Sequence, residues 1–430
     1  MNRERAGTRG RFDRGMRRRI LGASTAGVLL ISMAGCAGST QEASTSVSNP
    51  AASATATSGS DSTSAAATAN TELSSGSVTV TVGDKQITYT AAYLVDGIDA
   101  TISGGTYAST SADEVVFLVV NGGSLTVSDA TVDKSGDATS SDSQRASDVS
   151  DDYNFYGMNS AIVVVGNGST VSVGGTTITT TSSGSNAVVA VDEGSATVSD
   201  TTIRTSGNSA RGLHATYGGT IEASDMAIAT QGAHCADVAT DRGGGTVTVT
   251  GTNSFSTEGD GSPLIYSTGD ISVDGMTGTS SSSQAIVVEG KNSVTLTNSE
   301  VTSAGSDAVM IYQSMSGDAA DQDSAGSVGT VAIEDTAITY TGDGPVLYFT
   351  NTTAKLALTN ITVDSDATVL ASAAEDRWGN SGSNGADVTL TVSGSQLTGD
   401  VDAGDSSTIT VSLTDGATID GQTSGSVTMS

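Results

Sequence analysis

Apolar and polar residues alternate along this chain in a short phrase that returns about a dozen times. The phrase runs apolar, any residue, apolar, polar, Asp/Asn/Gly, any, any, apolar, as in residues 125–132. Such alternation predicts a β-strand with one buried face. The Asp, Asn or Gly that follows predicts a tight bend, because these residues tolerate left-handed backbone geometry best. A second short strand is expected directly after the bend.

The spacing of these phrases predicts the fold. Most copies begin 21 to 26 residues after the previous one, and three steps are longer, at 46, 37 and 34 residues. A third strand, apolar almost throughout, precedes many copies, as at Ile162–Val165 and Val188–Val191. Three short strands in ~22–25 residues form one coil of a parallel β-helix, and each coil hydrogen-bonds to the next. The sequence therefore predicts an all-β parallel β-helix solenoid of about 12 coils.

Other fold classes fit this pattern less well. A helical fold is disfavoured because 53 of the 430 residues are Gly and because Ser, Thr and Val dominate the repeats. A β-sandwich has no reason to repeat at this period, and the blades of a β-propeller need ~40 residues or more.

The first residues of the chain differ from the rest. Eight Arg and an apolar stretch at residues 20–33 describe an export signal over 1–35, which is too short to span a membrane. Residues 33–36, Met-Ala-Gly-Cys, resemble a bacterial lipobox, and this resemblance implies cleavage before Cys36 and attachment of lipid to it. Residues 17–21 also resemble a twin-arginine export motif, with an ordinary secretory signal as the alternative.

The remaining chain divides by composition. Residues 36–75 are nearly all Ser, Thr, Ala and Gly, which predicts a disordered, lipid-anchored tether. Residues 76–94 are expected to form strands that cap the solenoid. The coils then occupy 95–430, with polar insertions at the three long steps, at 133–158, 313–328 and 372–387. This organisation predicts an extracytoplasmic protein, anchored by lipid in a bacterial cell membrane and exposed at the surface.

The charge of the chain narrows the possible partners. The whole chain carries −30, and without the leader 9 bases stand against 45 acids, a net charge of −36. Nucleic acid is therefore excluded as a partner, and membrane contact is expected only through the lipid on Cys36. No cofactor is expected. Calcium is possible at stacked Asp-containing bends, although bend formation alone explains these Asp residues.

Polar residues concentrate in two adjacent coils. An Arg/His/Asp cluster there suits recognition of a glycan or a carboxylate, and a solvated group of salt bridges is the simpler alternative. Cys235 is expected to be a buried thiol, because it and His234 are consecutive in extended chain and point to opposite sides. The candidate binding residues are Arg211, His214, Tyr217, His234, Asp241 and Arg242.

The strand that is apolar on both faces raises a separate question, because one of its faces must point away from the core. Either the insertions at 133–158 and 313–328 cover this outer row, or the row binds a partner. We expect cover by the insertions. The residues assigned to the row are Val119, Val163, Val189, His214, Ala239, Ile265, Val287, Met310 and Tyr348.

The repeats, and above all the segments RGLHATYGGTI and HCADVATDRGGGTV that begin at Arg211 and His234, resemble right-handed parallel β-helix proteins of the pectate-lyase-like superfold. The resemblance is greatest to adhesin-like surface proteins of bacteria. It implies a right-handed solenoid that binds extracellular glycan or a cell-surface partner without catalysis. A polysaccharide lyase or glycoside hydrolase using Arg211, His214 and Asp241 is the alternative, although the chain lacks the Gly-His-Gly and Arg-Ile-Lys motifs of polygalacturonase-like members. A purely structural role in the cell envelope is a third possibility.

Overall fold

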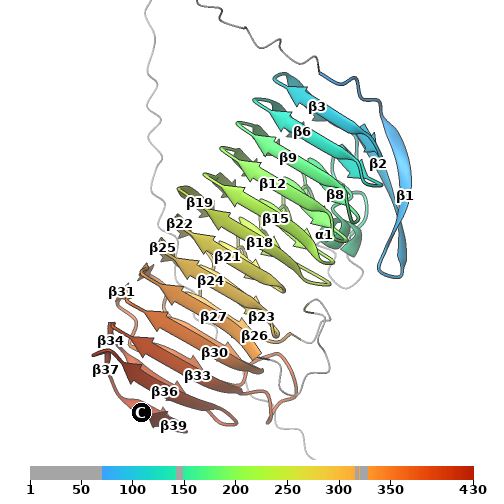
Figure 1. Cartoon of the computed structure of the whole chain (residues 1–430). Coiled ribbons are helices and arrows are strands. Elements are labelled where there is room, and N and C mark those ends of the chain that lie inside the picture. The colour runs from blue at the N-terminus through green and yellow to red at the C-terminus, as the bar shows by residue number, and fades with distance from the viewer. Residues whose placement is uncertain (1–69, 142–148, 315–318, 320–327) are drawn as a thin grey trace, which may run out of the picture. The chain divides into compact units, whose positions relative to one another are not determined.

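The computed structural model describes residues 70–141, 149–314, 319 and 328–430. They form a parallel β-solenoid of about 13 turns, in which most coils supply one strand to each of three long sheets (Figure 1). The predicted signal peptide, Cys36 and the tether up to residue 69 lie outside the described residues, as does most of the insertion at 313–328. Within the described part of the chain, no helix has the length and apolar character needed to cross a bilayer.

Sheets A and B run the length of the solenoid, sheet C ends at β31, and each sheet is named here by its letter. Sheet A comprises β1 (Gly76–Val82), β2 (Lys85–Asp96), β5 (Glu114–Val120), β8 (Ile162–Val165), β11 (Val188–Val191), β14 (Leu213–Thr216), β17 (Val238–Thr240), β20 (Ile265–Ser267), β23 (Ile286–Glu289), β26 (Val309–Tyr312), β29 (Leu347–Thr350), β32 (Val369–Ala373), β35 (Asp400–Ala403) and β38 (Thr423–Gly425). Sheet B comprises β3 (Asp99–Ser103), β6 (Ser124–Ser128), β9 (Thr170–Gly174), β12 (Ser195–Ser199), β15 (Gly219–Ser224), β18 (Gly245–Thr250), β21 (Asp270–Asp274), β24 (Ser293–Thr297), β27 (Val328–Glu334), β30 (Thr352–Thr359), β33 (Ala386–Ser393), β36 (Thr408–Thr414) and β39 (Val427–Met429). Sheet C comprises β4 (Thr106–Ser109), β7 (Thr131–Lys134), β10 (Thr177–Thr180), β13 (Thr202–Thr205), β16 (Ala227–Thr230), β19 (Asn253–Thr257), β22 (Met276–Ser280), β25 (Glu300–Ser303), β28 (Ala337–Tyr340) and β31 (Thr362–Ser365). A two-stranded sheet of β34 (Gln396–Thr398) and β37 (Thr418–Asp420) lies near the C-terminus.

The recurring phrase builds the corner between sheets B and C. Its alternating part is the sheet B strand, and its last apolar residue lies in the sheet C strand. The bend residue between them has left-handed geometry, with φ of 52° at Asp129, 47° at Asp200 and 49° at Asn298. This confirms the prediction that Asp and Asn at this position form tight bends.

The apolar residues of successive coils stack in columns. In sheet B, for example, Val127 pairs with Val173, Val173 with Val198, and Val198 with Ala223. These residues are buried in one continuous core inside the solenoid. Burial of such columns stabilises the fold by roughly 25 cal/mol per Å² of apolar surface, which makes each coil dependent on its neighbours. The predicted β-helix architecture is confirmed.

The C-terminal end differs from the expectation in one respect. The solenoid has about 13 coils rather than about 12, because β38 and β39 extend sheets A and B beyond the last copy of the phrase, which lies in β36. At the N-terminal end, β1 pairs antiparallel with β2 and forms a hairpin at the edge of sheet A.

A second apolar cluster lies on the outer face of sheet A, separate from the main core. It joins the β1–β2 hairpin and the helix α1 (Asp151–Tyr156) to the outer row of the first coils, where Leu118, Val163 and Val189 are buried. The expected cover by the insertion at 133–158 is therefore confirmed for the first coils only, and the cover expected from 313–328 lies largely outside the described residues. The hairpin contributes a cover that the sequence did not indicate. Figure 1 shows hairpin and helix at the N-terminal end of the solenoid.

The register of sheet A corrects two members of the predicted outer row. Val119 pairs with Val164, and Ile265 pairs with Val238 and Ile286, and all of these belong to the main core. The residues that face outward in those coils are Leu118 and Tyr266. In a strand that is apolar on both faces, apolar and polar residues do not alternate, so the sequence does not show which residues face outward.

Candidate functional site

The predicted binding residue Arg211 holds the insertion helix in place. It precedes β14, and its guanidinium donates to Asp241 Oδ2 at 3.2 Å and to Asn154 Oδ1, in α1, at 3.1 Å. Its side chain is about 11 % exposed. Arg211 therefore links a sheet A coil to the insertion, and Asp241 is its partner in the next coil.

Arg242 and Tyr217 fasten the same helix. Arg242 Nη1 lies 3.0 Å from Asp151 Oδ2, and its guanidinium lies 4.0 Å from the centre of the Phe155 ring. The Tyr217 ring stacks on Tyr156 at 5.3 Å, and their hydroxyls hydrogen-bond at 2.9 Å. Burial raises the pKa of Tyr217 above its usual value, so the phenol stays neutral.

His214 is fully buried on the outer face of β14. Its Nε2 lies 3.8 Å from Asp241 Oδ2. Burial, and then the charge of Arg211, lowers the pKa of His214 well below its usual value, so the imidazole is neutral and the contact with Asp241 is not an ion pair. A neutral histidine that solvent does not reach is poorly placed to transfer a proton to or from a ligand.

His234 and Cys235 differ in exposure, but the prediction that they are consecutive in extended chain is wrong, because His234 lies in a turn with left-handed geometry. His234 has a positive φ of 58° and is exposed, whereas the Cys235 thiol is buried and accepts from the Ala210 amide at 3.3 Å. Burial raises the pKa of this thiol to about 11, so it is an unreactive packing residue. The prediction of a buried thiol is confirmed.

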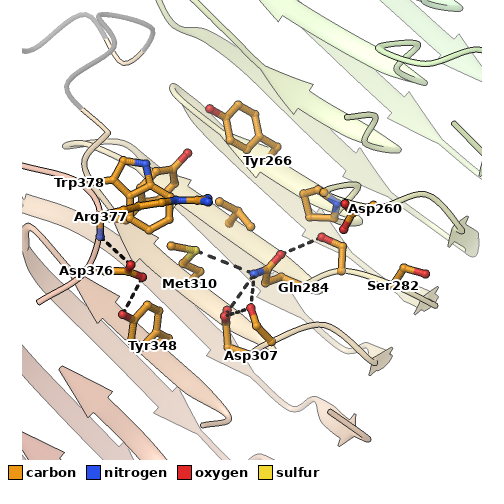
Figure 2. A pocket seen from close by; sticks show the side chains of 16 residues that line it. Asp260, Tyr266, Ser282, Gln284, Asp307, Met310, Tyr348, Asp376, Arg377 and Trp378 are labelled. Carbon is orange, nitrogen blue, oxygen red and sulfur yellow. Dashed lines mark hydrogen bonds between the residues drawn. The ribbon is translucent and has the colours of Figure 1, made fainter. Parts of the chain in front are cut away.

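Beyond α1, the outer face of sheet A forms a groove of about 490 Å³ (Figure 2). Its floor comes from one outward row in register, since Tyr266 pairs with Val287, Val287 with Met310, and Met310 with Tyr348. Val287 and Met310 are buried, and the two tyrosines that end the row are partly exposed. Adjacent rungs lie ~4.8 Å apart, so the row places an aromatic ring at each end of an apolar floor.

The insertion at 372–387 supplies one wall of this groove. Trp378 packs against Tyr312 at 4.7 Å between ring centres, and the Arg377 guanidinium lies 4.3 Å from the Trp378 ring. Asp376 accepts a hydrogen bond from the Tyr348 hydroxyl at 3.0 Å. Figure 2 shows Met310 between Trp378 and Arg377 on one side and Gln284 on the other.

Hydrogen bonds beneath the groove hold its aromatic rings. The buried Glu289 accepts from the Tyr266 hydroxyl at 2.8 Å and from the Tyr312 hydroxyl at 3.0 Å. The side chain of Asn384, which is also buried, donates to the backbone carbonyl of Trp378 at 2.6 Å. The rings are therefore fixed before any ligand arrives, which reduces the entropy lost on binding.

A buried carboxyl group lies beside the floor. Asp307 Oδ2 accepts from Ser306 Oγ at 2.7 Å and from Gln284 Nε2 at 3.2 Å, and Oδ1 makes no hydrogen bond with any described residue. Burial raises the pKa of Asp307 to about 6, and the nearby charge of Asp376 adds to this rise. Asp307 therefore changes its charge close to neutral pH.

A second hollow of about 310 Å³ adjoins the groove and shares Tyr266, Tyr312 and Arg377 with it. Of the predicted site residues, Arg211, His234 and Asp241 line this hollow. Of the other three, Tyr217 and Arg242 contact α1, and His214 is buried on the outer face of β14. The structure thus brings half of the predicted set to one end of the groove.

Sequence reasoning assigned Met310 and Tyr348 to the outer row without naming them as candidate binding residues, and it missed Tyr266, Tyr312 and Trp378, so the groove left only weak signals. Trp378 is the only tryptophan of the chain, and Met310 and Tyr348 interrupt an outer row that is otherwise mostly Val and Ala. As for metal, no group of three or more His, Cys, Asp or Glu lies where it could hold an ion in the part that the structure describes. Calcium binding stays a prediction. Searches against protein-family models and against curated proteins find no match to this chain.

Proposed function

We propose that this protein is an adhesin-like surface protein, anchored outside the cell by lipid on Cys36, and that it binds extracellular carbohydrate in the groove on sheet A without catalysis. The observation that carries the proposal is the set of partly exposed rings around the apolar floor, those of Tyr266, Tyr312, Tyr348 and Trp378.

Carbohydrate suits this groove because sugars present both apolar and polar surfaces. Their C–H faces pack on aromatic rings, and their hydroxyls need donors and acceptors nearby. Gln284, Asp260 and Arg377 supply such groups in the lining. The groove and the adjoining hollow together extend from Ala236, before β17, to Tyr348 in β29, which is roughly 20 Å along the stacked strands. This length suits a chain of several sugars.

The contacts and burial of the predicted catalytic residues favour glycan binding over lyase or hydrolase activity. Arg211 is tied to Asp241 and Asn154, and His214 is buried and neutral. A lyase or hydrolase is tested by incubating the protein with each retained glycan and analysing the products. Shortened chains or unsaturated ends would support the enzyme instead.

Removing the groove's aromatic wall is expected to abolish retention on glycans. Trp378→Ala with Tyr348→Ala should weaken binding by at least about 100-fold, since each ring contributes roughly 1.5–3 kcal/mol when covered and 1.4 kcal/mol is tenfold. The measurement is retention of the purified protein on a broad glycan array, followed by calorimetry with the best ligand. Trp378→Phe keeps a ring and is the matched control. Unchanged retention of the double variant would place the binding surface elsewhere.

The anchor is tested separately. Cells expressing the protein should incorporate radiolabelled palmitate into it, and Cys36→Ser should remove the label and release the protein into the medium. The control is Cys235→Ser, because Cys235 is the only other cysteine and is buried in the solenoid. Label that persists in Cys36→Ser would contradict lipid attachment at this residue.

A further inference from the structure

The charges around the groove are mainly negative. Three carboxyl groups line it, those of Asp260, Asp307 and Asp376, and among the described lining residues Arg377 is the one Lys or Arg. The Arg377 guanidinium is stacked on Trp378. Asp260 and Asp376 are exposed at the rim, whereas Asp307 is 2 % exposed beside the floor. An acidic polysaccharide is therefore a poor ligand, because its carboxylates would meet these groups.

Asp307 favours a positively charged ligand more directly. The donors to its Oδ2 are the neutral side chains of Ser306 and Gln284, and its Oδ1 accepts no hydrogen bond from the described residues. The titratable groups that face it are Asp376 in the 372–387 insertion, Tyr340 in β28 and Tyr348 in β29. None of these supplies positive charge. A cation in the groove would offset the unfavourable burial of the ionised carboxylate.

The positions of the acidic residues around the groove favour an extended, positively charged ligand over a single metal ion. No three acidic or His/Cys side chains among the described residues are close enough together to hold a metal ion. Asp260 and Asp376 belong to different elements, one before β20 and one after β32, so an extended ligand reaches both more readily than a single ion does. The rings of Tyr266 and Tyr348 also attract ammonium groups through their π faces.

We infer that the glycan bound by this groove carries free amines, as in a polymer of hexosamine units that are not acetylated. Its sugar rings would lie on the aromatic side chains, and its ammonium groups would face Asp260, Asp307 and Asp376. This inference rests on the proposed function and specifies its ligand class.

The test compares two ligands that differ only in acetylation. Calorimetry of the full-length protein at pH 7 is carried out with a glucosamine tetramer and with an N-acetylglucosamine tetramer. At this pH Asp307 is mostly ionised, since its pKa is about 6. The glucosamine tetramer is expected to bind at least tenfold more tightly, and this preference should weaken at high salt.

Substitution of single carboxyl groups shows which of them cause the preference for the free amine. Asp307→Asn and Asp376→Asn should each reduce the preference for the free amine several-fold and leave the melting temperature at or above that of the parent protein. Asp270→Asn, which changes an exposed Asp on sheet B, is the matched control and should leave the preference unchanged.

The outcomes separate the two proposals. If the acetylated tetramer binds as tightly as the free amine, or more tightly, the inference is overturned and carbohydrate binding in the groove stands. If glycans other than these two tetramers are retained through Trp378 and neither tetramer binds, the inference about free amines fails and the proposed function stands. If no glycan is retained, both proposals fail.

Discussion

Replacing Phe155 and Tyr156 together by alanine is expected to detach α1 from sheet A and to lower the stability of the protein by several kcal/mol. Both side chains are about 5 % exposed, and truncation of a buried aromatic residue costs roughly 3–5 kcal/mol. The loss should be large because the helix is short, with six residues, and depends on tertiary contacts rather than on its own propensity.

Several contacts depend on these two residues. Tyr156 stacks on Tyr217, its carbonyl accepts from the Tyr89 hydroxyl at 2.8 Å, and the Phe155 carbonyl accepts from Thr216 Oγ1 at 2.7 Å. At the end of the helix, Gly157 has a φ of 68° and lies so close to Val189 that an added Cβ would approach it to 3.0 Å. The helix is thus seated directly on the outer row.

The readout is exposure of that row. The double variant should bind more hydrophobic dye, associate into oligomers and be cut more rapidly by protease near residues 151–156. Asp152→Ala is the control, because it removes only an exposed ion pair with Lys85, which contributes at most about 1 kcal/mol. If the variant stays monomeric with unchanged dye binding and melting temperature, the insertion does not protect the sheet.

Replacing Asp237 by alanine is expected to stabilise the protein by about 2 to 4 kcal/mol at pH 7. Asp237 is fully buried, and its carboxylate oxygens make no hydrogen bond of ordinary geometry with the described residues. The corresponding position one coil earlier is Gly212, and the next coils have Leu264 and Ala285 there, both in the main core. Alanine therefore fits a site where neighbouring coils are apolar.

The stabilisation by Asp237→Ala should depend on pH, and the direction of this dependence follows from proton binding by Asp237. Burial raises the pKa of Asp237 well above the ordinary value of 3.8, although the Thr230 hydroxyl partly opposes this. The folded state therefore holds the proton more tightly than the unfolded chain does. The associated stability is fully present below the unfolded pKa and is lost as the pH rises toward the folded one. Stability of the parent protein should fall from about pH 4 upward, and it should fall less in Asp237→Ala, where Asp307 still titrates.

Urea unfolding between pH 4 and pH 8 measures this difference. Asp237→Asn removes the titration but keeps a polar group in the core, so its pH profile should flatten with a smaller gain in stability. Asp364→Ala, an exposed change on β31, is the matched control and should shift stability by less than about 0.5 kcal/mol. Parallel pH profiles for the parent and Asp237→Ala would show that Asp237 does not titrate on unfolding.

The local sequence pattern was enough to predict the solenoid fold. The alternating phrase, its period and the Asp or Asn at its bend were enough to predict stacked coils, because residues such as Val173 and Val198 can bury one face only by aligning with the coil above and below. Cover of the outer row was also predictable, since a long apolar strip exposed to water is unfavourable. These features depend on short-range patterning and on the general preference of apolar surface for burial.

Only the tertiary structure showed which residues of the sheet A strands face outward and which residues line the groove. No alternation marks which of Val119 and Leu118 faces outward, so only pairing with the next coil settles it. Arg242 meets a partner 91 residues away, and Trp378, in the insertion after β32, packs against Tyr312 in β26. Contacts of this kind depend on where loops fold back onto the solenoid. Repeat spacing carries no information about that, because the loops are the parts that depart from the repeat.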